Sequence, residues 1–202
     1  ILPSGLAKNN ACGSSAVYLV DLEGHADQDS PGRIFAAEVN GGPIPIVDTS
    51  PTGVSIGTEI LSTPNGSDIA NAIPASPIVI TPDTAPNIPW RGAMVYINDL
   101  EGKITKINLS NNTKGFNNDG ELIDGVTSLY DQTTLFRING NEDNERYSYF
   151  GMDAGLGVSD GGFWLFGSTG NFTNLGSRED TIDNILYGVR DLHYPYWRHL
   201  NN

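Results

Sequence analysis

The chain has 202 residues, of which 24 are acidic and 11 are basic, so its formal net charge is −13. This charge disfavours nucleic-acid binding, which uses a basic face to release counterions, and it disfavours electrostatic docking on anionic membranes. No apolar run reaches the roughly 18 residues that a membrane helix needs, so we expect no membrane span.

Short β-branched or aromatic segments recur along the chain and are separated by loop residues. The sequence holds 24 Gly and 12 Pro, and it contains no long stretch with a clean 3.6-residue apolar period. Short apolar segments bounded by Gly, Pro, Asn or Asp are typical of strands. We therefore predict an all-β chain, with strands at 16–21, 33–39, 76–81, 93–99, 103–109, 133–138, 163–167 and 184–191.

Three segments carry further expectations. In the strand 103–109 (KITKINL), Lys, Thr and Asn are interspersed with Ile and Leu, which predicts a strand with one face in water. Trp164 lies inside a strand pattern, so we expect it in the core rather than against a cofactor. The aromatic-rich C-terminal segment 193–199 (HYPYWRH) is interpreted as an interface or a loose tail.

One phrase occurs twice: VYLVDLEG at 17–24 returns as VYINDLEG at 95–102, 78 residues further on. In the second copy Gly102 leads directly into the next strand, which predicts a tight hairpin in which glycine supplies a positive φ. The first copy has eight extra residues, HADQDSPG, before its second strand begins. We expect 17–21 and 95–99 to be equivalent second strands of successive four-stranded sheets.

A third unit follows, made of YFGMDAGLGV (149–158), GGFWLFGSTGNF (161–172) and DNILYGVRD (183–191). Each unit reads as an inner strand, a strand with an aromatic residue, a glycine turn and an outward strand. Repeats that each supply one small sheet are typical of a β-propeller. The sequence predicts a partial, β-propeller-like domain over 1–202, with about three four-stranded blades at roughly 15–62, 72–138 and 147–192 and a short tail at 193–202.

The ordered phrases resemble those of a known family. The DLEG hairpin, the STGNF phrase at 168–172 and the LYGVRD phrase at 186–191 are similar to phrases of the C-terminal propeller of PilC/PilY-type type IV pilus tip proteins. The resemblance covers roughly 15–192 and implies a ring of about seven blades. Three blades leave open strand edges, which we expect the remaining blades or domains of the same protein, or another chain, to cover.

The resemblance also implies a function outside the cell, at the cell surface or the pilus tip. There the protein would serve pilus biogenesis, surface attachment and twitching motility as a binding and scaffolding propeller, with minor pilins and a host or abiotic surface as partners. The alternative is a fragment of a propeller enzyme, such as a quinone-dependent dehydrogenase, or of a glycan-binding lectin. We expect no enzyme, because the three histidines are scattered and no HExxH or phosphate-binding glycine loop is present.

Calcium is the one cofactor that the loops could bind, because it takes six to eight oxygen ligands on a flexible loop. The family carries an Asp-rich nine-residue calcium loop, to which this chain has no clean match. The closest segment is NGNEDNE, with Asn139, Asn141 and Asp143 at alternate positions. Its ninth place is Tyr147, which cannot complete the cage with a carboxylate.

Two other loops are alternatives for calcium. They offer Asp27 and Asp29 in the inserted loop of the first hairpin, or Asn117, Asp119 and Asp124 further on. For each of the three stretches the competing interpretation is a solvated acidic loop.

Overall fold

The computed structural model describes two sets of residues. Side chains are described at 73–81, 92–110, 113–117, 119–126, 133–138, 140, 144–159, 161–176, 182–198 and 200, and for four N-terminal strands and Gln132 the backbone alone is described. Within these residues every element is a strand except η3 (Phe172–Asn174), a short 3-10 helix. The predicted all-β class is confirmed.

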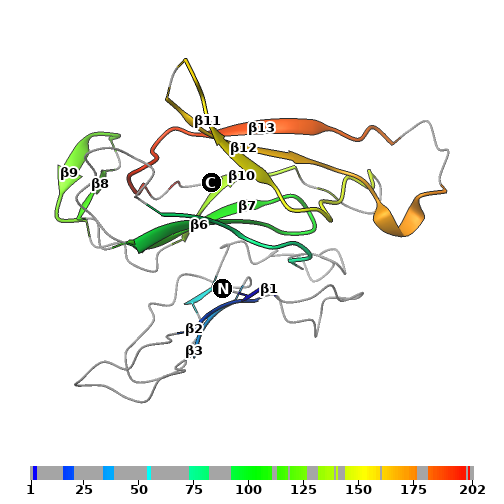
Figure 1. Ribbon diagram of the computed structural model, residues 1–202, viewed down its shortest axis with the longest axis horizontal. Coiled ribbons are helices and arrows are strands. Elements are labelled where there is room, and N and C mark those ends of the chain that lie inside the picture. The colour runs from blue at the N-terminus through cyan, green and yellow to red at the C-terminus, as the bar shows by residue number, and fades with distance from the viewer. Residues whose placement is uncertain are drawn as a thin grey trace.

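The first sheet has four strands in the order β1-β2-β3-β4 (Figure 1). The pairings of β1 with β2 and of β2 with β3 are antiparallel, whereas β4 runs parallel to β3. These strands are β1 (Leu2–Pro3), β2 (Ala16–Val20), β3 (Ile34–Glu38) and β4 (Val54–Ser55).

The second sheet also has four strands, in the order β5-β6-β7-β10, and all its pairings are antiparallel. They are β5 (Ile78–Ile80), β6 (Gly92–Asn98), β7 (Ile104–Ser110) and β10 (Gln132–Phe136). Between β7 and β10 the chain forms a separate hairpin of β8 (Lys114–Phe116) and β9 (Leu122–Asp124), which the sequence pattern did not predict.

The two DLEG hairpins have the same strand register. Val20 lies opposite Ile34 in the first, and the corresponding Asn98 lies opposite Ile104 in the second. Between these paired residues the sequence has 13 residues (21–33) in the first copy and 5 (99–103) in the second, and the difference equals the eight extra residues of the first copy. Both β2 and β6 are the second strand of their sheet.

The second DLEG turn is a three-residue hairpin loop that ends on a glycine. Gly102 has a φ of 79° and donates its N–H to the Asp99 carbonyl at 3.0 Å, while Asp99 donates its own N–H to the carbonyl of Lys103 at 3.1 Å. The Asp99 carboxylate accepts the Lys103 N–H at 2.9 Å. Glycine is required because other residues resist this left-handed conformation, as predicted.

The same turn anchors the chain that leads to the third sheet. Leu100 is fully buried and packs with Tyr147 and the half-buried Tyr149. The Leu100 carbonyl accepts the N–H of Ser148 at 2.8 Å, and the Glu101 carbonyl accepts that of Gly140 at 2.9 Å. The DLEG phrase therefore builds both a turn and a contact site for the next unit.

The third sheet has three described strands in the antiparallel order β11-β12-β13, one fewer than the four expected for a blade. In Figure 1 it lies over the sheet that contains β6, β7 and β10. Its strands are β11 (Asp153–Leu156), β12 (Phe163–Ser168) and β13 (Leu186–Asp191).

Side chains of the second and third sheets and of the C-terminal segment form one core. The buried members of this cluster are Met94, Tyr96, Ile104, Met152, Phe163, Leu165 and Trp197. Trp197 is 3% exposed, and the Tyr194 ring stacks on Phe163 at 4.6 Å between ring centroids. The interpretation of this segment as a loose tail is wrong, because its aromatic rings complete the core.

Trp164 does not lie in this core. Residues alternate between the two faces of a strand, and its neighbours Phe163 and Leu165 take the buried face. Trp164 is half-buried on the opposite face, where its ring stacks with Phe166 at 6.4 Å. The expectation of a core tryptophan fits Trp197 instead.

Strand β7 is buried on both faces, so the prediction of one wet face is wrong. The alternation of polar and apolar residues breaks at Thr105 and Lys106, which places Lys106 on the same face as Ile104. Lys106 is 1% exposed and Thr105 is equally buried on the other face. A lysine this deep needs a partner, because burial of an uncompensated charge is costly.

Candidate functional site

The residues expected to bind calcium fall largely outside the described part of the chain. This applies to Asn139, Asn141 and Asp143, and also to Asp27 and Asp29. Tyr147, at the ninth place of the first loop, is buried with its ring against Leu100. Tyr147 therefore supports the turn rather than a metal ion.

The third candidate set lies on the β8–β9 hairpin, where Asn117 and the exposed Asp119 belong to the same turn but Asp124 lies apart from them. Asn117 closes the turn, where its side chain accepts the Glu121 N–H at 2.9 Å and donates to the Glu121 carboxylate at 3.1 Å. Asp124 lies opposite Lys114, three residues down the hairpin from Asn117 and therefore about 10 Å away. Among the described residues, no group of three or more His, Cys, Asp or Glu could hold a metal ion.

The partner of Lys106 is Asp191, the last residue of β13. The Lys106 Nζ lies 2.6 Å from Asp191 Oδ2, and both side chains are at most 1% exposed. The Tyr96 hydroxyl donates to the same oxygen at 2.9 Å, and Nζ donates also to the Tyr196 carbonyl at 3.0 Å. Nζ further lies over the rings of Tyr96 and Trp197 at 5.9 and 5.8 Å.

The remaining Asp191 oxygen organises the C-terminal turn. Oδ1 accepts the backbone N–H groups of His193 at 3.0 Å and Tyr194 at 3.2 Å. These bonds turn the chain after β13 so that Trp197 reaches the core. Sequence reasoning missed this pair, although a lysine within an apolar strand and an aspartate that closes the LYGVRD phrase were its visible signals.

Burial and charge act in opposite directions on the pair. Burial lowers the pKa of Lys106, against the charge of Asp191. Burial alone would raise the pKa of Asp191, but the charge and hydrogen bonds of Lys106 hold it below its usual range. Burial and the Asp191 charge raise the pKa of Tyr96 well above its ordinary value. We therefore assign this network a structural role, in which it joins the second and third sheets.

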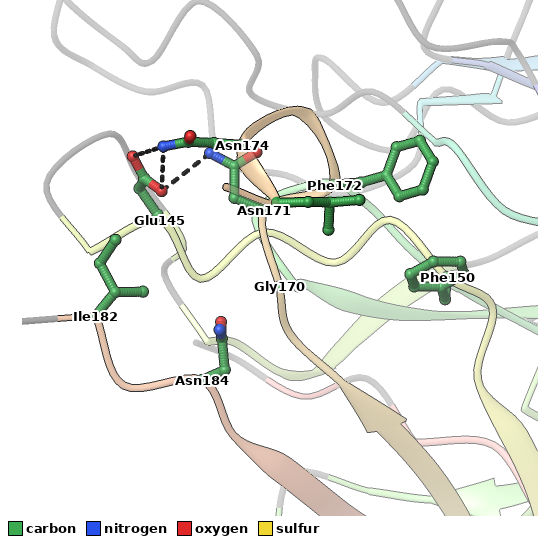
Figure 2. A pocket seen from close by; sticks show the side chains of 9 residues that line it. Glu145, Phe150, Gly170, Asn171, Phe172, Asn174, Ile182 and Asn184 are labelled. Atoms are coloured by element: carbon green, nitrogen blue, oxygen red, sulfur yellow. Dashed lines mark hydrogen bonds between the residues drawn. The ribbon is translucent and has the colours of Figure 1, made fainter. Parts of the chain in front are cut away.

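A cleft lies at the other end of β12, where the STGNF phrase leaves the sheet. Thr169 ties this phrase to the approach to β13, since its N–H donates to the Ile185 carbonyl at 3.0 Å and its hydroxyl accepts the Ile185 N–H at 2.9 Å. The cleft has a volume of about 390 Å³. It is lined by Glu145, Phe150, Gly170, Asn171, Phe172, Asn174, Leu175, Ile182 and Asn184 (Figure 2).

Among the described residues that line the cleft, Glu145 is the only charged one. Its Oε2 accepts the Asn171 side-chain amide at 3.1 Å, and both of its oxygens lie 3.4 Å from the Asn174 amide nitrogen (Figure 2). Its φ of 49° is the one left-handed conformation of a non-glycine residue among those described. Such a conformation costs energy and persists where surrounding contacts impose it, often at functional sites.

The neighbouring Asn171 fixes the cleft wall. Its Oδ1 accepts both the N–H of Thr173 at 3.0 Å and the Thr173 hydroxyl at 2.7 Å. With its nitrogen on Glu145, Asn171 is held at both ends of its amide. The sequence singled out STGNF as a family phrase but gave no signal that Glu145 would meet it.

Comparisons with known proteins identify no relative of this chain: no family model, no curated protein and no solved structure matches it. The part of the chain that the structure describes contains no helix long and apolar enough to cross a membrane.

Proposed function

We propose that this chain is part of a β-propeller in a type IV pilus tip protein of the PilC/PilY kind, and that it acts by binding and scaffolding rather than by catalysis. Its place would be outside the cell, at the cell surface or pilus tip, in pilus biogenesis, surface attachment and twitching motility. Minor pilins and a host or abiotic surface would be its partners.

The observation that carries this proposal is the shared register of the two DLEG hairpins. Both hairpins supply the second and third strands of a four-stranded sheet, and their loops differ by the length of the inserted segment. Equivalent hairpins in successive sheets are what blade repeats predict. The core between the second and third sheets supports the same arrangement, since adjacent blades pack face to face.

In this proposal the chain supplies about three blades of a ring of about seven. The outer face of the third sheet, with the stacked rings of Trp164 and Phe166, would then receive the next blade. Calcium, if it binds, would brace the loop of Asn139, Asn141 and Asp143, with the other two loops as alternatives. Its carboxylate and amide oxygens would supply structural support and no chemistry.

Deletion of the parent gene in the organism that encodes it tests this function. We expect loss of piliation, twitching and surface attachment, restored by the intact gene. Complementation with Trp164→Asp and Phe166→Asp combined should fail, whereas Leu192→Asp, at a site that is 71% exposed in the turn after β13, should restore all three. Unchanged piliation, twitching and attachment in the deletion strain would refute the assignment.

A further inference from the structure

We propose that the cleft beside η3 binds a neutral saccharide. The cleft has about 390 Å³, within the range of small-molecule sites, and combines polar side chains with exposed aromatic rings. This inference stands on the cleft alone, so it holds whether or not the chain belongs to a pilus.

The polar half of the cleft offers a hydrogen-bond acceptor and a donor. The Glu145 carboxylate has about four lone-pair sites, and amides of Asn171 and Asn174 occupy only part of them. Asn184 accepts the Thr169 hydroxyl with its Oδ1 at 3.3 Å, while its side-chain nitrogen has no bonded partner among the described residues. In Figure 2 the Asn184 side chain points into the space below Glu145, beside Ile182.

This combination fits a sugar because each sugar hydroxyl both donates and accepts a hydrogen bond. One hydroxyl can donate to the Glu145 carboxylate while another accepts from the Asn184 amide. A hydrogen bond to a charged group is the stronger kind, so Glu145 would contribute most to orientation.

The aromatic half consists of Phe150 and Phe172, which Figure 2 shows together on the far side of the Gly170–Asn171 segment. They are 62% and 56% exposed, and their rings are almost perpendicular at 6.0 Å between centroids. A ring face of this kind can pack against the C–H face of a pyranose, which is apolar although its rim is polar. The separation of the two halves favours an oligosaccharide over a single ring.

Charge disfavours two other ligand classes, anions and metal ions. The described lining contains no Lys, Arg or His, so nothing there would bind an anion, and the net charge of −13 repels one. A metal cation would need several more oxygens than the single Glu145 carboxylate, and no group of acidic residues is present among those described.

The site is also held in place before a ligand arrives. The backbone at Glu145 is fixed in its left-handed conformation, its carboxylate is held by two amides, and the Gly170 N–H donates to the Tyr147 carbonyl at 2.8 Å. Preorganisation of this kind reduces the entropy lost on binding.

Saturation-transfer NMR on the 202-residue chain tests the proposal, with maltotriose, cellotriose, mannotriose and chitotriose as probes. We expect at least one probe to bind saturably at millimolar concentration. Phe172→Ala should weaken that binding about tenfold and Asn184→Ala about fivefold, because each removes one contact. Both residues are exposed, so these variants should keep the fold, as circular dichroism would show.

Phe166→Ala is the matched control, since Phe166 is 49% exposed on β12 and does not line the cleft. It should leave the affinity unchanged. Absence of saturable binding by all four probes would overturn the proposal, and so would equal affinity in Phe172→Ala and in the unaltered chain. Binding of calcium alone that Glu145→Gln abolishes, without sugar binding, would also overturn it. A pilus phenotype without sugar binding would refute this inference while leaving the proposed function intact.

Discussion

The second and third sheets share a core but differ in their opposite faces. In the second sheet, Val95, Ile97 and Ile107 point away from the shared core and are still at most 3% exposed. In the third sheet, the corresponding face carries the half-buried Trp164 and the exposed Phe166. The second sheet is therefore covered on both sides, whereas the third is covered on one side within the described residues.

This difference explains where the chain can place polar residues. Strand β7 has no face in water, so its Lys106 requires the buried carboxylate of Asp191. Strand β13 keeps Arg190 on its exposed face, so its charge is not buried. The buried ion pair thus follows from the position of β7 between two covered faces, and it fixes the third sheet on the second.

The largest effect should come from Asp191→Ala, which leaves Lys106 buried without its carboxylate. We expect the free energy of unfolding to fall by about 3–5 kcal/mol, the usual cost of removing one partner of a buried pair. Urea denaturation followed by tryptophan fluorescence measures this. Asp191→Asn keeps an oxygen for the N–H groups of His193 and Tyr194, so it should be the milder variant. A loss below about 1 kcal/mol in Asp191→Ala would show that the pair does not join the sheets.

The two faces of β12 provide the next test. Phe163→Ala removes a ring that is 3% exposed and should cost about 3–5 kcal/mol through the cavity it leaves. Phe166→Ala removes the same ring from the outer face and should cost less than about 1 kcal/mol in the isolated chain. Urea denaturation compares the two. Similar losses would mean that the outer face is also covered, against the contrast between the sheets.

Local patterns predicted the strands well because each strand is encoded by its own residues. All eight predicted strands correspond to β2, β3, β5, β6, β7, β10, β12 and β13. The DLEG hairpin was predictable for the same reason, because glycine at its end is the residue that most readily adopts the positive φ of such a turn. The β8–β9 hairpin was missed because LID and KGF are too short to show an alternating pattern.

Contacts between distant segments could not be predicted from these patterns. Lys106 and Asp191 are 85 residues apart, and a lysine in a mixed strand has the same local appearance whether it faces water or a carboxylate. Glu145 likewise lies 26 residues from Asn171, and its left-handed backbone follows from tertiary contacts. The cleft could therefore be recognised only in the structure, whereas the STGNF phrase that forms part of it was visible in the sequence.

Alanine substitutions at two glycines with positive φ compare a packed turn with an open one. Gly102 has a φ of 79°, and an added Cβ would lie 2.7 Å from the Ile138 side chain. Gly125 has a φ of 82° with no atom within 4 Å of an added Cβ. Gly125→Ala should therefore cost only the backbone penalty of about 1 kcal/mol, and Gly102→Ala about 3 kcal/mol because overpacking is added. Thermal and urea denaturation distinguish them, and equal losses would contradict the packed turn.

The smallest effect concerns the pH dependence of two buried aspartates, whose pKa shifts have opposite signs. The pKa of Asp191 lies below its unfolded value, so its contribution to stability is present above about pH 4 and is lost as the pH falls toward its folded pKa. Burial raises the pKa of Asp99 above its unfolded value despite the nearby Lys103, so ionisation of Asp99 reduces stability as the pH rises from about 4 toward its folded pKa.

The variants Asp191→Asn and Asp99→Asn distinguish the opposite pH dependences that the two aspartates should confer. As the pH falls from 6 to about 3, the stability advantage of the unaltered chain over Asp191→Asn should shrink, and its advantage over Asp99→Asn should grow. Each slope is bounded by one proton, or about 1.4 kcal/mol per pH unit. Urea denaturation at each pH measures the three proteins side by side. Slopes of the same sign would mean that one of the two aspartates lies in an environment different from the one described. The first candidate would be Asp99, which lies 3.5 Å from the Lys103 ammonium.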